Sequence, residues 1–80
     1  MRRSDQPQPA LGKAIRQLRE KRGMTQEALA HEAGITVGHM STIERGHSNP
    51  TWGTIRGIAQ ALDVSMGEVA KLADQKDRLS

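Results

Sequence analysis

Apolar residues recur every three or four positions along five segments of the chain, which is the spacing of an α-helix with one buried face. The pattern predicts helices over residues 10–23, 25–34, 36–46, 51–64 and 65–75. Four of these segments begin with a residue that can cap a first turn: Thr25, Thr36, Thr51 and Ser65. Because no segment shows the alternation of a β-strand, the pattern indicates an all-α fold.

The inner face of each predicted helix supplies a candidate core. Its expected members are Leu11, Ile15, Leu18, Leu29, Ala30, Ala33, Ile35, Met40, Ile43, Trp52, Ile55, Ile58, Ala59, Leu62, Met66, Val69 and Leu72. Ser65 and Glu68 have the spacing of a capping box at the start of the last helix. Eighty residues suffice for one small domain. We expect it over residues 10–73, after a flexible N-terminal arm (1–9) and before a frayed polar tail (74–80).

The segment over residues 36–46 has two different surfaces. Met40 and Ile43 have the spacing of a core-facing pair. At about 100° per residue, Gly38, Thr42 and Arg45 fall on the opposite side. Small and polar residues there are compatible with a solvated face or with a binding surface, and composition alone does not separate these interpretations.

The connection before this segment is short. The helix over 25–34 is joined through Gly34 and Ile35 to the cap Thr36. A residue that tolerates positive φ lets the chain turn sharply and cross the two helices. A short helix, a glycine turn and a second helix with a polar face form the helix-turn-helix pattern, although many helical hairpins share this spacing.

The stretches "LGKAIRQLREKRGMTQEALAHEAGI", "STIERG" and "SNPTWGTIRGIAQALDVS" resemble the phage-repressor, or Xre-like, helix-turn-helix family over residues 11–73. The most specific matches are Arg19, Gln26, Ala30 with Gly34, and Glu44 with Gly46. The resemblance implies a compact five-helix, lambda-repressor-like fold. It also implies a regulator of transcription that binds double-stranded DNA, with residues 36–45 in the major groove.

The same resemblance implies which residues contact DNA. The expected base contacts are Val37, Gly38, His39 and Thr42. The expected phosphate contacts are Gln26, Thr36, Ser41, Arg45, His47, Ser48 and Asn49. Val37 can instead lie at the edge of the core, and Arg2 and Arg3 either enter a minor groove or belong to an unused tail. Many family members have longer polar side chains at positions 37 and 38, so we expect either the shape of the DNA or a close approach of the protein backbone to contribute to recognition.

Charge supports a polyanionic partner. The chain has a pI near 10.0, and up to Arg56 it has nine Lys or Arg against five Asp or Glu. From Gly57 onward three basic residues face four acidic ones. With Trp52 as its one aromatic residue, the chain lacks a stacking platform for single strands, which favours a duplex.

Other classes of function find little support. His31, His39 and His47 lie on different elements without a cluster of Asp, Glu or Cys, so we expect no metal site. The sequence has no cysteine, and it shows neither an ordered catalytic triad nor a phosphate-binding loop after a strand, which argues against an enzyme. It also has no apolar run long enough for a membrane, and we expect no signal peptide. We therefore expect a cytoplasmic, nucleoid-associated protein that is not an enzyme and uses no cofactor or small-molecule effector.

Two expectations concern contacts between elements. Arg19 and Glu44 each lie at the margin of an apolar face, where an unpaired charge is costly, so we expect them to form an ion pair. The resemblance implies a homodimer on a palindromic operator. We expect Met66, Val69 and Leu72 at its interface, with the outward Gly53 and Gly57 allowing close approach, unless the last helix is consumed by its own core.

A different class of function is an antitoxin or adaptor whose main partner is a protein. It would need a broad apolar patch outside the core or a long neutralising tail. The tail "DQKDRLS" is short and polar, which favours the DNA-binding interpretation.

Overall fold

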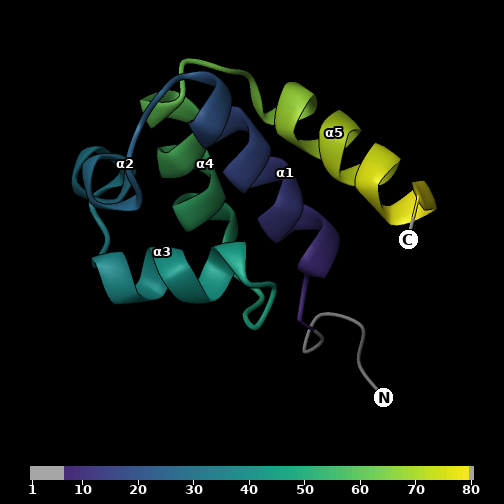
Figure 1. The fold of residues 1–80 in the computed structure, drawn as a ribbon, viewed down its shortest axis with the longest axis horizontal. Coiled ribbons are helices and arrows are strands. Elements are labelled where there is room, and N and C mark those ends of the chain that lie inside the picture. The colour runs from purple at the N-terminus through teal and green to yellow at the C-terminus, as the bar shows by residue number, and fades with distance from the viewer. Residues whose placement is uncertain (1–6, 80) are drawn as a thin grey trace.

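The computed structural model describes residues 7–79, which form five α-helices and no β-strand (Figure 1). The helices are α1 (Pro9–Lys21), α2 (Gln26–Ala33), α3 (Val37–Glu44), α4 (Trp52–Ala61) and α5 (Met66–Leu79). The all-α, five-helix fold expected from the sequence is confirmed. Residues 1–6 of the expected arm, with Arg2 and Arg3, lie outside the described residues.

Local capping explains where four of the five described helices start, and α1 begins at Pro9 without a side-chain cap. The hydroxyl of Thr36 accepts a hydrogen bond from the N–H of His39 at 3.0 Å, and Thr25 and Thr51 cap α2 and α4 in the same way. At α5, Ser65 accepts from the Glu68 N–H at 3.0 Å while the Glu68 carboxylate accepts from the Ser65 N–H at 3.2 Å. The predicted capping box is therefore present.

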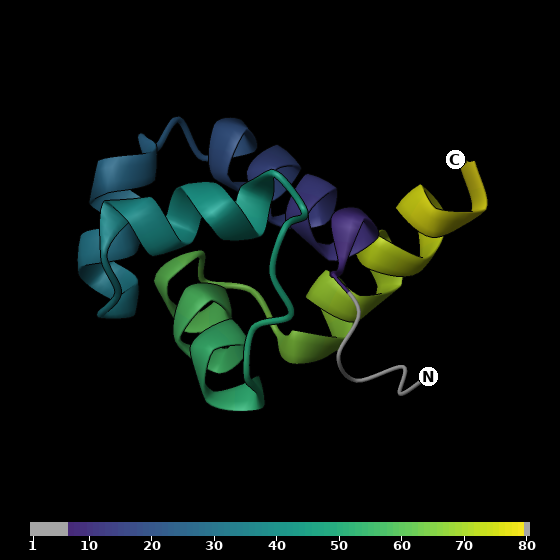
Figure 2. The same cartoon turned by 90° about the horizontal axis from the view of Figure 1, so that it is seen from below.

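The helices pack so that α3 lies at one surface of the molecule. α1 packs against α5 and α3, α2 packs against α3 and α4, and α4 also contacts α5. In the view from below, α3 crosses the front of the molecule (Figure 2). The core lies behind α3, and its largest fully buried side chains are Ile15, Leu29, Met40, Ile43, Ile58, Leu62 and Val69.

Gly12 has a role that the sequence pattern did not reveal. It is buried in the first turn of α1, and a Cβ there would clash with the carbonyl oxygen of Ile43 and lie 2.8 Å from that of Glu44. Only a residue without a side chain lets α1 pass this close to the end of α3. The signal in the sequence was a glycine inside an otherwise periodic helix.

Two expectations about the fold were wrong. Trp52 was expected in the core but is 69% exposed, because it is the first residue of α4 and extends past the edge of the core. The C-terminal residues were expected to fray after residue 73, but α5 continues to Leu79. No glycine or proline interrupts this segment, and Lys76 and Arg78 in its last turn complement the helix dipole.

Candidate nucleic-acid interface

A sharp turn sets α3 across α2. Gly34 ends α2 with φ 78 and ψ 28, in the left-handed region, where glycine alone among the common residues is unstrained. The N–H of Ile35 returns to the carbonyl of Ala30 at 3.0 Å, and Thr36 then caps α3. The two helices pack against each other and form the helix-turn-helix arrangement.

The two surfaces of α3 are separated as the sequence predicts. Met40, Ile43 and Glu44 are buried, whereas Val37, Gly38 and His39 are exposed. Val37 is 46% exposed, so its alternative place at the edge of the core does not apply. The eight residues of α3 span about 12 Å, and a helix of this size fits the major groove of B-DNA.

Thr42 and Ser41 are half-buried on the flanks of this outer face. The Thr42 hydroxyl donates to the Gly38 carbonyl at 3.0 Å, which fixes its rotamer and leaves its lone pairs and methyl group for other contacts. The Nε of Arg45 donates to the Ser41 carbonyl at 3.3 Å, so the Arg45 side chain lies along α3.

The end of α3 is closed by backbone hydrogen bonds. The N–H of Gly46 donates to Ile43 at 3.0 Å and the N–H of His47 donates to Thr42 at 3.1 Å, with Gly46 at φ 77. This places the exposed His47 and Asn49 and the half-buried Ser48 directly after the outer face of α3. The Gln8 N–H donates to the Ser48 carbonyl at 3.1 Å and anchors this loop to the start of α1.

A hydrogen-bonded ion pair holds α3 on α1. Arg19 donates from Nε to Glu44 Oε2 at 2.7 Å and from Nη2 to Oε1 at 3.0 Å. The side chains are 12% and 2% exposed. Arg19 also donates from Nη1 to the Met24 carbonyl at 2.8 Å. The hydrogen bond to Glu44 raises the pKa of Arg19 more strongly than burial lowers it, so Arg19 stays charged throughout the neutral range.

Gln26 joins this network, which its sequence position gave no reason to expect. Its Nε2 donates to Glu44 Oε1 at 3.0 Å, across a separation of 18 residues. Gln26 is the first residue of α2 and its side chain is half-buried. The residue expected to contact a phosphate is therefore held by α3 in the free protein.

Comparisons with known proteins decide the family. Residues 10–72 match the helix-turn-helix domain. The chain belongs to the helix-turn-helix domain family. The uncharacterized HTH-type transcriptional regulator y4dJ of Sinorhizobium fredii is 37% identical over 65 residues, which cover 81% of this chain and 84% of the relative.

Solved structures agree with this assignment. The clp gene regulator ClgR from Corynebacterium glutamicum superimposes with a TM-score of 0.88 and 29% identity, covering 90% of this chain and 77% of that one. The restriction-modification controller protein C.AhdI from Aeromonas hydrophila superimposes with a TM-score of 0.75 and 33% identity, covering 76% and 92%. The fold of this helix-turn-helix protein is thus that of transcription regulators.

Gly38 is unusual within the helix-turn-helix unit. A Cβ at this position would have the Thr36 hydroxyl, at 4.0 Å, as its nearest neighbour. No close packing and no positive φ requires a glycine here. Neither packing within the protein nor backbone conformation therefore explains a glycine at this position, where it weakens the helix.

An apolar groove lies on another side of the helix-turn-helix protein, between the starts of α4 and α5. Its volume is about 240 Å³. It is lined by Leu11, Trp52, Ile55, Met66, Gly67, Val69 and Ala70. The loop over residues 45–51 connects α3 to α4, and the first residues of α4 line the groove.

The structure corrects two of the residues expected at a dimer interface. Val69 is 1% exposed and belongs to the core, so its side chain is not available to a partner. Gly57 does not face outward, because a Cβ there would lie 3.0 Å from the Ala33 carbonyl oxygen of α2. Met66 and Leu72 are half-buried, and Gly53 has open space around it.

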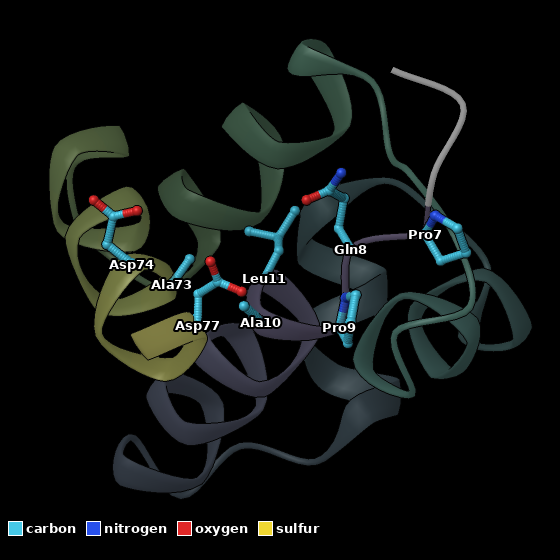
Figure 3. A pocket seen from close by; sticks show the side chains of 8 residues that line it. All are labelled: Pro7, Gln8, Pro9, Ala10, Leu11, Ala73, Asp74 and Asp77. Atoms are coloured by element: carbon cyan, nitrogen blue, oxygen red, sulfur yellow. The ribbon is translucent and has the colours of Figure 1, made fainter. Parts of the chain in front are cut away.

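A second hollow of about 400 Å³ lies between residues 7–11 and α5 (Figure 3). Figure 3 shows Asp74 and Asp77 beside it, opposite Pro7, Gln8 and Pro9. It lies where the start of α1 meets α5, not on the outer face of α3. Among residues 7–79 no three His, Cys, Asp or Glu side chains gather as metal ligands. No helix in that range is long and apolar enough to span a membrane.

Proposed function

We propose that this protein is a sequence-specific regulator of transcription that places α3 in the major groove of double-stranded DNA. The observation that supports this most directly is the outer face of α3. It presents the exposed Val37, Gly38 and His39 with the half-buried Thr42 beside them, and the ion pair of Arg19 and Glu44 holds α3 on α1. The neighbour C.AhdI is a restriction-modification controller protein, and such control is one form that this regulation takes.

The contacts divide into two groups. Val37, Gly38, His39 and Thr42 occupy the outer face and its flank, where they can meet base edges. The remaining candidates surround this face and are suited to phosphates: Gln26, Thr36, Ser41, Arg45, His47, Ser48 and Asn49. Phosphate contacts orient a protein on DNA, whereas base contacts select the sequence.

The test is fluorescence anisotropy with a duplex selected from a random library, compared with random duplex over a range of salt concentrations. A DNA-binding protein loses affinity with a log–log slope of about −0.9 for each phosphate that it neutralises. Preference for the selected duplex supports specific recognition. A flat salt response would refute DNA binding and favour a protein-binding antitoxin or adaptor.

We also propose that two copies bind a palindromic operator, joined through the apolar groove. Trp52 is a large exposed apolar side chain at the rim of this groove, and tryptophan is frequent among residues that dominate interface energies. All the lining residues are uncharged, so a second copy meets no like charge there. The half-buried Met66 and Leu72 extend the surface along α5.

Sedimentation velocity tests the dimer. Trp52→Glu should leave the circular dichroism spectrum unchanged, because the side chain is exposed, and should shift the protein to monomer. Gln60→Glu adds the same charge to an exposed position of α4 and should have no effect on the oligomeric state. A wild-type protein that remains a monomer at tens of micromolar, both free and on DNA, would refute the dimer but not the DNA binding.

A further inference from the structure

The carboxylate of Glu44 makes one contact that its ion pair with Arg19 does not require. Oε1 accepts a hydrogen bond from Arg19 Nη2 and a second from Gln26 Nε2, each at 3.0 Å. We propose that Glu44 is a positioning residue for DNA binding, which acts by orienting the amide of Gln26 toward a phosphate. This inference rests on the proposed function of the chain.

The chemistry of the two groups determines how the amide lies. An ionised carboxylate only accepts hydrogen bonds, so the nitrogen of the Gln26 amide must face Glu44 and the amide oxygen must face away. The same nitrogen carries a second hydrogen. That N–H remains for a phosphate while the first stays on Glu44, so DNA binding requires no break in the network.

The acceptor is itself immobile. The Glu44 side chain is 2% exposed, and its two oxygens receive two hydrogen bonds from Arg19. An exposed glutamine would lose rotamer freedom when it binds a phosphate, at a cost of about twofold to tenfold in affinity. A glutamine already held in place avoids most of this loss.

The arrangement also links two helices. Gln26 begins α2 and Glu44 ends α3. A phosphate contact made from α2 is thus set by the helix that is proposed to read the bases. The position of α3 and the contact of α2 with the DNA phosphates then both depend on the carboxylate of Glu44.

A double-mutant cycle on random duplex DNA tests the proposal. Glu44→Asp keeps the negative charge beside Arg19 but withdraws the acceptor from Gln26 by one methylene. It should weaken binding about twofold to tenfold, and it should cause no further loss when combined with Gln26→Leu. Glu27→Asp, at an exposed position of α2, removes the same methylene and should bind like wild type.

The outcomes separate the possibilities. Equal losses from Glu44→Asp with and without Gln26→Leu would mean that Glu44 acts only through the fold, which would overturn the inference. Wild-type affinity in Gln26→Leu would also overturn it while leaving the proposed function intact. Failure of every form, wild type included, to bind any duplex would refute the proposed function itself.

A measurement on the wild-type protein covers the case in which Glu44→Asp does not fold. Side-chain ¹⁵N relaxation of the Gln26 amide should show restricted motion in the absence of DNA. The amides of Gln17 and Gln60, both exposed, serve as mobile references. If the Gln26 amide moves as freely as these two, Glu44 does not position it.

Discussion

Replacing Gly38 by alanine should stabilise the free protein and weaken its binding to operator DNA. Glycine inside a helix is less stable than alanine by about 0.5–1 kcal/mol. The added Cβ would have no neighbour closer than the Thr36 hydroxyl at 4.0 Å, so no clash offsets this gain. In a domain of this size 1 kcal/mol corresponds to about 4–8 °C in Tm, and we expect a rise of about 2–8 °C.

The effect on DNA binding has the opposite sign. If the backbone at Gly38 approaches the base edges closely, a methyl group intrudes on a packed interface. Overpacking of this kind costs about 1–3 kcal/mol, or roughly fivefold to hundredfold in affinity for the operator. Circular dichroism melts and anisotropy titrations on the same preparations measure the two effects.

Gly53→Ala is the matched control. Gly53 is also the second residue of a helix capped by threonine, and its Cβ would have the Thr51 hydroxyl at 3.9 Å as nearest neighbour. Both variants should gain similar stability. On a single half-site, where no dimer contact at Gly53 enters, only Gly38→Ala should lose affinity, and equal half-site affinity in the two variants would refute a close approach at Gly38.

Four other variants test the remaining assignments. Glu44→Ala should lower the free energy of unfolding by about 3–5 kcal/mol, because it leaves Arg19 nearly buried without its counter-charge. Urea titration measures this loss, and a loss below about 1 kcal/mol would contradict the prediction. Thr42→Ala should reduce the ratio of operator to random-duplex affinity about tenfold, whereas Arg45→Ala should weaken both and lower the salt slope by about 1. An unchanged ratio in Thr42→Ala would remove it from the base contacts. Gly12→Ala should cost about 3 kcal/mol or more, because its Cβ meets the backbone of α3, and a melting temperature like that of wild type would refute this close approach.

Most of the helical framework could be predicted from the sequence because its determinants act over a few residues. Apolar spacing of three and four identified the buried faces of α1 to α5. The caps at Thr25, Thr36 and Ser65 bond to N–H groups three residues ahead. The ion pair of Arg19 and Glu44 was predictable for another reason, since a charge at the margin of an apolar face requires a partner.

Where the sequence was misleading, the outcome depended on how helices dock. Trp52 has the spacing of a core residue, but it is the first residue of α4 and lies beyond the edge of the core, which α4 first meets at Ile55. Gly57 was expected on an outer face, and the arrival of α2 against α4 places the Ala33 carbonyl over it. Helical periodicity tells which residues share a face but not what that face meets.

The sequence by itself determined the helices, most of their caps, most of the core and the separation of α3 into a buried and an exposed face. The tertiary structure decided that Trp52 lies outside the core, that Gly12 lets α1 and α3 touch, and that Gln26 meets Glu44. These contacts join residues from different helices. Their geometry depends on the angles and offsets at which helices pack, which no local pattern in the chain specifies.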